Sequence, residues 1–414
     1  MTDLDIFKNE FVPNIESHAK LSFASWQKTA PIDYARWVAF RDAILRGETP
    51  VAPLMTTKYG KALVATGKMA YDVVVPPPPP PTINEKHGVA YMSWGNGYLP
   101  TIHKNDYDML FLSWGGAGKV ATSGITTKTV VYMSAVSCLE NSGWHYGVTG
   151  EDAIANNWVL KEGTRLLRNA GYPTSYIGDP GSIGYQQRWC NNVIGKIQEW
   201  GVDGVFIDDF YGSLSLADGI PDKYPTKDLQ RTALFSFIKY VYNQMKSAGI
   251  KVYTNSVVYE GEMGDDAGLT TIPWWTMIAP HVDGLCAEYW QWRNNSTQKI
   301  RKLGPEWYNH WDTWQALPAF CESNSKEFIG IMYSDNYSRP ASDKVYVLCS
   351  MLLETTNGSI VSSNSSTNPW IPEYDLLPLG NPLGTKIQNG NRWQRQYERG
   401  LIWVDPTLGT SGII

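Results

Sequence analysis

Short apolar runs and longer amphipathic segments alternate along the chain from residue 88 onward. Apolar runs bounded by turn residues predict buried strands, and eight such runs can be recognised. They are Gly88–Trp94, Met109–Trp114, Thr129–Ala135, Asp203–Asp208, Ile250–Asn255, Asp283–Glu288, Phe328–Ser334 and Gly358–Ser363. Amphipathic segments between successive strands are typical of a parallel βα architecture.

Two of these intervening segments have an apolar residue at every third or fourth position. The first covers 186–200 with Trp189, Val193, Ile197 and Trp200, and the second covers 226–249 with Leu229, Ala233, Phe237, Val241 and Met245. This spacing predicts helices with one buried face. Gly201 and Gly249 follow as C-terminal stops.

Eight strand and helix units over roughly 280 residues match a (β/α)8 TIM barrel, which commonly has about 250 residues. An open doubly wound sheet is the alternative fold. Such a sheet normally has a glycine-rich nucleotide loop, and the stretches SWGNGY and SWGGAGK match neither GxGxxG nor GxxxxGK[ST]. We therefore predict an α/β barrel over residues 83–385. The stretch RWQRQYERGLIWVDP predicts a C-terminal β-hairpin within 386–414 that packs on the barrel.

Six consecutive prolines, Pro76 to Pro81, separate the barrel from the N-terminal part. A polyproline II helix of this length is a stiff spacer of about 19 Å, so residues 76–82 are interpreted as a linker. Residues 1–75 carry helical signals, with Pro31 suited to a first turn and Gly47 to a stop. We interpret them as a partly helical attachment segment. A small domain packed on its neighbour is an equal alternative.

Composition narrows the class of partner. The formal net charge of -5 without a basic tract argues against nucleic acid. The N-terminus MTDLDIFKNEF lacks signal-peptide regions, and no apolar run approaches the ~20 residues of a membrane helix, so membrane insertion is not expected. Five separated cysteines argue against a disulfide framework. The 18 tryptophans and 24 tyrosines suit sugar rings, although large cores also use them.

Candidate chemistry gathers where the predicted strands end, because the active site of a (β/α)8 barrel lies at that face. The strand ends supply Trp94, Trp114, Asp208, Asp209, Asn255, Glu288, Tyr333 and Asp335. Glycosidic bond cleavage typically needs two carboxyl groups across the scissile bond, and the fourth and sixth strands can supply them. No HExxH, GxSxG or His/Cys cluster with metal spacing is present, so we expect neither metal nor cofactor. Asp203 and Asp283 begin strands and are interpreted as turn or cap residues.

Side chains alternate along a strand, so only one of Asp208 and Asp209 can point into the barrel mouth unless the strand has already ended. The sequence pattern does not favour either aspartate as the one that points into the barrel mouth. A helix cap or a buried hydrogen-bonding pair is the structural alternative for the aspartates, and a rim salt bridge is the alternative for Glu288.

The motifs GVDGVFIDD, VYTNS, VDGLCAEYW and RQYERGLIWVDP resemble a family of glycoside hydrolases with a (β/α)8 barrel, related to endo-α-1,4-polygalactosaminidase-type hydrolases. The resemblance implies that Asp208 is the nucleophile and Glu288 the acid/base, with Asp209 positioning or tuning them. It also implies that Asn255 hydrogen-bonds the substrate or the nucleophile, and that Asp179 has a structural or substrate-positioning role.

The layout of a short N-terminal part, a proline rod and an enzyme-like domain resembles minor tail proteins of bacteriophages that infect actinobacteria. The resemblance implies a virion tail location, reached without a signal peptide, and contacts to other tail proteins through residues 1–75. The leading hypothesis is a retaining glycoside hydrolase that acts on a host cell-envelope polysaccharide. Its candidate sugar platforms are Trp94, Trp114, Tyr211, Trp290 and Trp292. The competing hypothesis is an inactive structural tail protein or adhesin that only binds glycan.

Overall fold

The computed structural model describes residues 86–93, 99–100, 103–140, 147–258, 267–291, 300–304, 310–332, 340–361 and 370–414. The expected N-terminal helical segment and the proline linker lie outside these residues. So do four predicted site residues, namely Trp94, Trp292, Tyr333 and Asp335.

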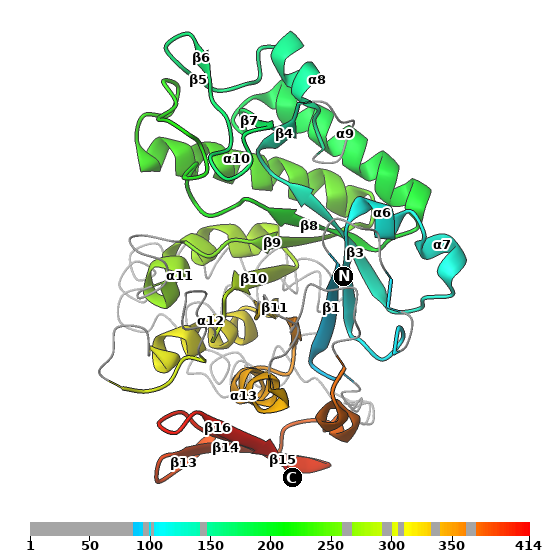
Figure 1. Ribbon diagram of the computed structural model, residues 1–414, viewed down its shortest axis with the longest axis vertical. Helices are drawn as coiled ribbons and strands as arrows, with labels where there is room; N and C mark the ends of the chain where they lie inside the picture. The colour runs from blue at the N-terminus through cyan, green and yellow to red at the C-terminus, as the bar shows by residue number, and fades with distance from the viewer. Residues whose placement is uncertain are drawn as a thin grey trace, which may run out of the picture. The chain divides into compact units, whose positions relative to one another are not determined.

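Eight parallel strands form a closed barrel, as the sequence pattern predicts (Figure 1). They are β1 Val89–Ser93, β2 Met109–Leu112, β3 Lys128–Ser134, β8 Gly204–Asp208, β9 Lys251–Asn255, β10 Gly284–Glu288, β11 Glu327–Ile331 and β12 Gly358–Val361. Each strand pairs with its neighbours in chain order, and β12 pairs with β1 through Val89 and Ala90 to close the ring. The TIM-barrel prediction is confirmed.

The strands are apolar on both faces because helices cover the outside and side chains fill the inside. One buried cluster consists of strand residues from all eight strands and forms the barrel interior: Ala90, Met92, Met109, Phe111, Val130, Phe206, Tyr253, Cys286, Ile329, Ile331 and Val361. Alternate residues such as Val205 and Ile207 belong to the larger cluster that includes the helices. Membership of the two clusters therefore tells which way each strand residue points.

Among the described residues, the α-helices are α6 Trp114–Ala117, α7 Val120–Ser123, α8 Gly150–Ala155, α9 Ile183–Trp200, α10 Lys227–Ser247, α11 Ala267–Ile278, α12 Trp311–Ser323 and α13 Ala341–Leu352. Both predicted helices are confirmed as α9 and α10. Gly201 directly follows α9 and Gly249 comes one residue beyond the end of α10, and they take left-handed φ values of 65° and 74°, a conformation that glycine adopts without strain. The predicted buried face of α10 fails at Leu229, which is 46% exposed in the first turn.

An insertion between β3 and α9 adds short strands that the sequence analysis did not predict. β4 Ser137–Leu139 pairs with β7 Ser175–Ile177, and β5 Lys161–Glu162 pairs with β6 Arg165–Leu166. Strands of two or three residues are too short to show a hydrophobic period. In Figure 1 the insertion lies with α8 beyond the β8 side of the barrel.

The predicted C-terminal hairpin is the central pair of a four-stranded antiparallel sheet. Its strands follow the order β13 Ile387–Asn389, β14 Arg392–Tyr397, β15 Gly400–Asp405 and β16 Thr410–Ile413. The sheet lies against α13 (Figure 1), where the Tyr397 hydroxyl donates to the Leu352 carbonyl at 2.6 Å and Arg395 donates to the same carbonyl at 3.1 Å. These bonds satisfy a carbonyl at the helix C-terminus, where the last carbonyls lack intrahelical donors.

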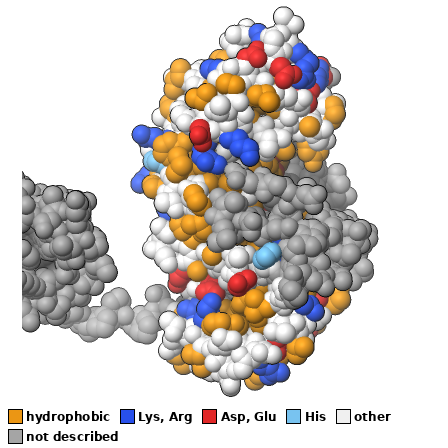
Figure 2. Space-filling view, turned by 90° about the vertical axis from the view of Figure 1, so that its left-hand side faces the viewer, with side chains coloured by type: hydrophobic (Ala, Val, Ile, Leu, Met, Phe, Trp, Pro, Cys, Tyr) orange, Lys and Arg blue, Asp and Glu red, His pale blue; other side chains and the backbone are white. Residues whose placement is uncertain are grey.

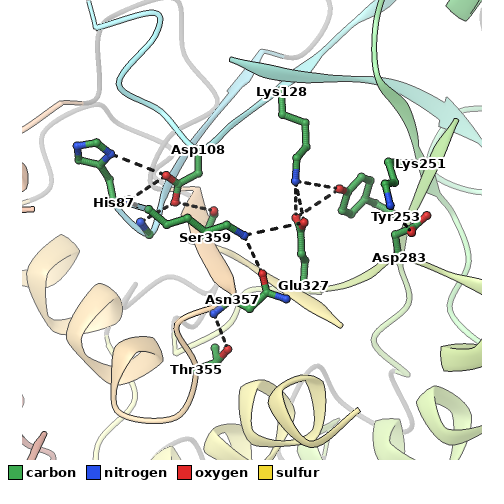
Figure 3. A network of polar contacts seen from close by, with 12 residues as sticks. His87, Asp108, Lys128, Lys251, Tyr253, Asp283, Glu327, Thr355, Asn357 and Ser359 are labelled. Carbon is green, nitrogen blue, oxygen red and sulfur yellow. Dashed lines mark hydrogen bonds and ion pairs between the residues drawn. The ribbon is translucent and has the colours of Figure 1, made fainter. Parts of the chain in front are cut away.

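The N-terminal end of the barrel is filled by a polar network (Figure 3). Lys128 Nζ lies 2.7 Å from Glu327 Oε1 and 3.3 Å from the Tyr253 hydroxyl. Asp203 accepts from the Thr129 amide at 2.7 Å, and Asp283 accepts from the Val252 amide at 2.9 Å. Both aspartates thus hold neighbouring strands at the end away from the predicted site, in keeping with a cap role.

The described part of the chain contains no helix long and apolar enough to cross a membrane. Nor do those residues include a group of three or more His, Cys, Asp or Glu side chains that could hold a metal ion. On the face in Figure 2, basic and acidic side chains are interspersed with apolar ones over the described surface.

Candidate active site

Strand parity selects Asp208 as the aspartate that faces the barrel interior. Phe206, two residues before it, belongs to the interior cluster, whereas Val205 and Ile207 pack toward the helices. Asn255 and Glu288 follow the interior residues Tyr253 and Cys286 by the same two-residue step. The three side chains therefore converge at the C-terminal mouth of the barrel.

The Asn255 side chain bridges the two predicted catalytic carboxyl groups. Its Nδ2 donates to Asp208 Oδ1 at 2.8 Å and to Glu288 Oε2 at 2.9 Å. The two carboxyl oxygens are therefore no farther apart than these two bonds laid end to end.

The Tyr211 hydroxyl lies between the same two carboxyl groups, 3.3 Å from Asp208 Oδ1 and 3.3 Å from Glu288 Oε2. A phenol has one hydrogen to donate. Tyr211 can therefore donate fully to one carboxyl group, or share its hydrogen between both in a three-centre bond, which the two equal distances fit. Tyr211, predicted as a sugar platform, thus lies in hydrogen-bonding reach of both acids.

Asp209 comes directly after the end of β8. Its φ of 60° is left-handed, a conformation that aspartate adopts more readily than most residues. Its Oδ2 accepts from the Ser134 hydroxyl at 2.5 Å and from the Ser137 hydroxyl at 2.9 Å. Ser137 in turn accepts from the Asn169 amide at 3.0 Å, which connects the insertion to the strand end.

Both aspartates hold protons more tightly than usual. Burial raises the pKa of Asp208, against the hydrogen bonds donated by Tyr132 and Asn255. Burial, with the adjacent charge of Asp208, raises the pKa of Asp209 to about 7, and the hydroxyls of Ser134 and Ser137 oppose this shift. Raised carboxyl pKa values in one place are typical of functional sites.

Two of the predicted substrate-binding residues make structural contacts. Trp290 is fully buried, its indole N–H donates to the Trp314 carbonyl at 3.0 Å, and its ring packs on Phe328, so it has no face for a sugar. The Asp179 carboxylate accepts from Lys223 at 2.5 Å and from the Tyr224 hydroxyl at 2.6 Å. It ties the insertion to the segment before α10.

Trp114, the remaining predicted platform among the described residues, begins α6 directly beyond β2 and is 40% exposed. The structure leaves part of its indole accessible at the C-terminal side of the barrel.

Sequence reasoning missed Tyr132 on β3. Its hydroxyl donates to Asp208 Oδ2 at 2.8 Å. The missed signal is the alternation of side chains along a strand. Tyr132 lies two positions from both Val130 and Ser134 on a predicted strand, so the three share one face. Once Val130 is placed in the interior, Tyr132 must follow it.

A sequence profile of the hypothetical glycosyl hydrolase family 15 matches residues 126–401. No curated protein matches the chain. Similar solved structures include a noncanonic maltogenic α-amylase, AmyB, from Thermotoga neapolitana, with 10% identity and a TM-score of 0.46 over 78% of this chain and 87% of that one. They also include an α-amylase from Geobacillus thermoleovorans, with 11% identity and a TM-score of 0.43 over 73% of this chain and 77% of that one.

The cycloalternan-degrading enzyme from Trueperella pyogenes matches with 10% identity and a TM-score of 0.43, over 69% of this chain and 44% of that chain. The present chain thus spans less than half of that enzyme. Similarities at this level carry no information on substrate. The profile match is different, because it extends over well more than half of the sequence and takes in Asp208, Asn255 and Glu288. The chain belongs to the hypothetical glycosyl hydrolase family 15.

Proposed function

We propose that the protein is a retaining glycoside hydrolase that cleaves a cell-envelope polysaccharide, with Asp208 as the nucleophile and Glu288 as the acid/base. The observation that carries the proposal is the shared amide of Asn255. A single nitrogen atom, Nδ2, donates to both Asp208 Oδ1 and Glu288 Oε2, so the two carboxyl groups lie close together. Retaining enzymes have carboxyl groups about 5–5.5 Å apart, whereas inverting enzymes leave room for a water between them.

In the first step, a carboxylate oxygen of Asp208 forms a bond to the anomeric carbon while the bond from that carbon to the leaving oxygen breaks. The leaving oxygen takes the proton of Glu288. In the second step, water gives a proton to Glu288 and its oxygen bonds to the anomeric carbon, which releases Asp208 as a carboxylate. These steps require one proton on the pair at the start of the cycle, carried by Glu288.

The roles of the two acids follow from what each must do at the start of the cycle. Asp208 must be ionised to attack, and it accepts hydrogen bonds at both oxygens, which favour the anion. Glu288 must carry the proton. Asp209 follows Asp208 directly, and its contribution is to tune the pair through its own charge, which depends on pH because its pKa is raised to about 7.

The test is release of reducing ends from a panel of purified envelope polysaccharides by the wild type, Asp208→Asn and Glu288→Gln. We expect release by the wild type and none by either variant, with retention of anomeric configuration in the first product seen by NMR. Asp179→Asn is a matched control, because it changes an aspartate at a structural tie and should keep its activity. Inversion of configuration contradicts the retaining assignment.

An adhesin gives a different outcome in the same experiment. Binding of a polysaccharide by all three proteins, without release by any of them, favours an inactive glycan-binding tail protein over the hydrolase.

The virion location is a proposal that rests on the layout of residues 1–82. Deletion of residues 1–75 should abolish incorporation into phage particles and leave polysaccharide hydrolysis intact. Normal incorporation of the shortened chain contradicts an attachment role for that segment.

A further inference from the structure

Tyr132 reaches the proposed nucleophile from inside the barrel. It lies opposite Phe206 in the register of β3 and β8, and the centroids of their rings are 6.4 Å apart. Phe206, two positions before Asp208 on the same strand, fills the barrel interior beneath it. The Tyr132 ring is packed there and its hydroxyl contacts Asp208 Oδ2 at 2.8 Å, so the donor is delivered by a side chain with little rotational freedom.

The two oxygens of Asp208 are held by different elements. Asn255 on β9 donates to Oδ1, and Tyr132 on β3 donates to Oδ2. The terminal torsion of an aspartate is broad and roughly two-fold when nothing restrains it. Donors on both oxygens fix the plane of the carboxylate. Asn255 is shared with Glu288, whereas Tyr132 reaches the other oxygen of Asp208 from a different strand.

The geometry points to Tyr132 as a positioning residue for the nucleophile: its hydroxyl fixes the orientation of the Asp208 carboxylate and favours its ionised form. This inference rests on the proposed function, because it takes Asp208 as the attacking group. It adds a residue and a role that the carboxyl pair alone does not contain.

The direction of the effect follows from the surroundings of Asp208. The titratable groups that face it among the described residues are Tyr132, Asp209, Tyr211, Cys286 and Glu288. Burial raises the pKa of Asp208, and the hydrogen bond from Tyr132 opposes that rise. Loss of this bond therefore raises the pKa further. The acid limb of the rate profile, where Asp208 gains its proton, moves to higher pH.

The test compares Tyr132→Phe with Tyr253→Phe. Both variants lose one hydroxyl from a tyrosine of the barrel interior, but the Tyr253 hydroxyl lies at the opposite end, 3.3 Å from Lys128 Nζ and 3.3 Å from Glu327 Oε2. We expect Tyr132→Phe to lower kcat/KM about 10- to 100-fold and to move its acid limb up by about one pH unit. Tyr253→Phe should leave both quantities unchanged.

A readout besides activity separates this inference from the proposed function. The pKa of Asp208 is measured by carboxyl 13C NMR in the wild type and both Phe variants, with Asp208→Asn identifying the resonance. A higher pKa in Tyr132→Phe alone supports the inference. Equal pKa values in all three proteins overturn it, whether or not the wild type hydrolyses glycan. Hydrolysis by the wild type with an unshifted acid limb in Tyr132→Phe also overturns it and leaves the proposed function intact.

If Tyr132→Phe does not fold, 3-fluorotyrosine at position 132 gives the same decision. It keeps the ring and the hydroxyl, and its more acidic hydroxyl is the stronger donor. The pKa of Asp208 should then fall below the wild-type value. An unchanged or higher pKa overturns the inference.

Discussion

The two ends of the barrel place their acidic side chains in opposite surroundings. At the N-terminal end, Glu327 lies 2.7 Å from Lys128 and Asp283 lies 3.0 Å from Lys251, so each carboxylate meets a cation. At the C-terminal end, the described hydrogen-bond partners of Asp208 and Asp209 are neutral hydroxyls and amides. One end balances its charges and the other gathers charges of one sign.

This difference separates stability from chemistry. Paired charges help to hold the strands together. Gathered carboxylates repel one another, and burial without a cation raises their pKa values, which lowers stability but keeps protons available near neutral pH. Substitutions at the N-terminal end should therefore change mainly the unfolding free energy of the protein. Substitutions of the proposed catalytic carboxyl groups at the C-terminal end should change mainly its catalytic rate.

The largest expected effect is the loss of catalytic rate in the Asp208→Asn variant. The variant should lose about ten-thousandfold in kcat because no carboxylate remains to attack, while its thermal midpoint should stay equal or rise because one buried charge is gone. Initial rates and calorimetry check the two parts. A parallel loss of rate and midpoint contradicts the separation of the two ends.

Asp209→Asn should change how stability depends on pH. The pKa of Asp209 is raised from 3.8 to about 7, so between these values the folded wild type keeps a proton that the unfolded chain has lost. Wild-type stability should therefore fall relative to the variant as pH rises from about 4 to about 7, by about 1.4 kcal/mol for each unit of raised pKa. Urea unfolding at several pH values measures it, and a constant difference across this range argues against a raised pKa.

Glu327→Gln should lower the unfolding free energy by about 1–3 kcal/mol and leave kcat unchanged, because it removes the partner of a partly buried lysine far from the site. Denaturant unfolding and initial rates give the two numbers. The double variant Lys128→Met/Glu327→Leu is the control and should recover part of the loss. A drop in kcat would contradict the separation of stability and catalysis between the two ends of the barrel.

Lys251→Ala should have the smallest effect, about 0–1 kcal/mol, because its ion pair with Asp283 is 57% exposed on the lysine side. The same unfolding measurement applies. A loss as large as that of Glu327→Gln would show that exposure does not separate the two pairs.

Much of the barrel was predictable because each strand is an apolar run between turns. What the pattern could not give was orientation, since Phe206 and Ile207 are equally apolar although one faces the interior and the other the helices. For the same reason Asp208 and Asp209 could not be separated by alternation alone. The choice of Asp208 from family resemblance agrees with the parity that the structure shows.

The tryptophans show a second limit. Trp290 and Trp114 both stand near strand ends in the sequence, but Trp290 is buried against Phe328 and Trp114 is 40% exposed. Burial depends on neighbours far away in the chain, which composition does not reveal. Tyr132 was missed because its partner Asp208 lies 76 positions further along the chain.

The hydrogen bonds from Tyr397 and Arg395 to the Leu352 carbonyl have a consequence for how the chain is made. The last helix of the barrel is fastened by strands that leave the ribosome some forty residues later, because β14 begins at Arg392 and α13 ends at Leu352. The donors that complete the hydrogen bonding at the C-terminus of α13 are therefore synthesised well after the helix itself.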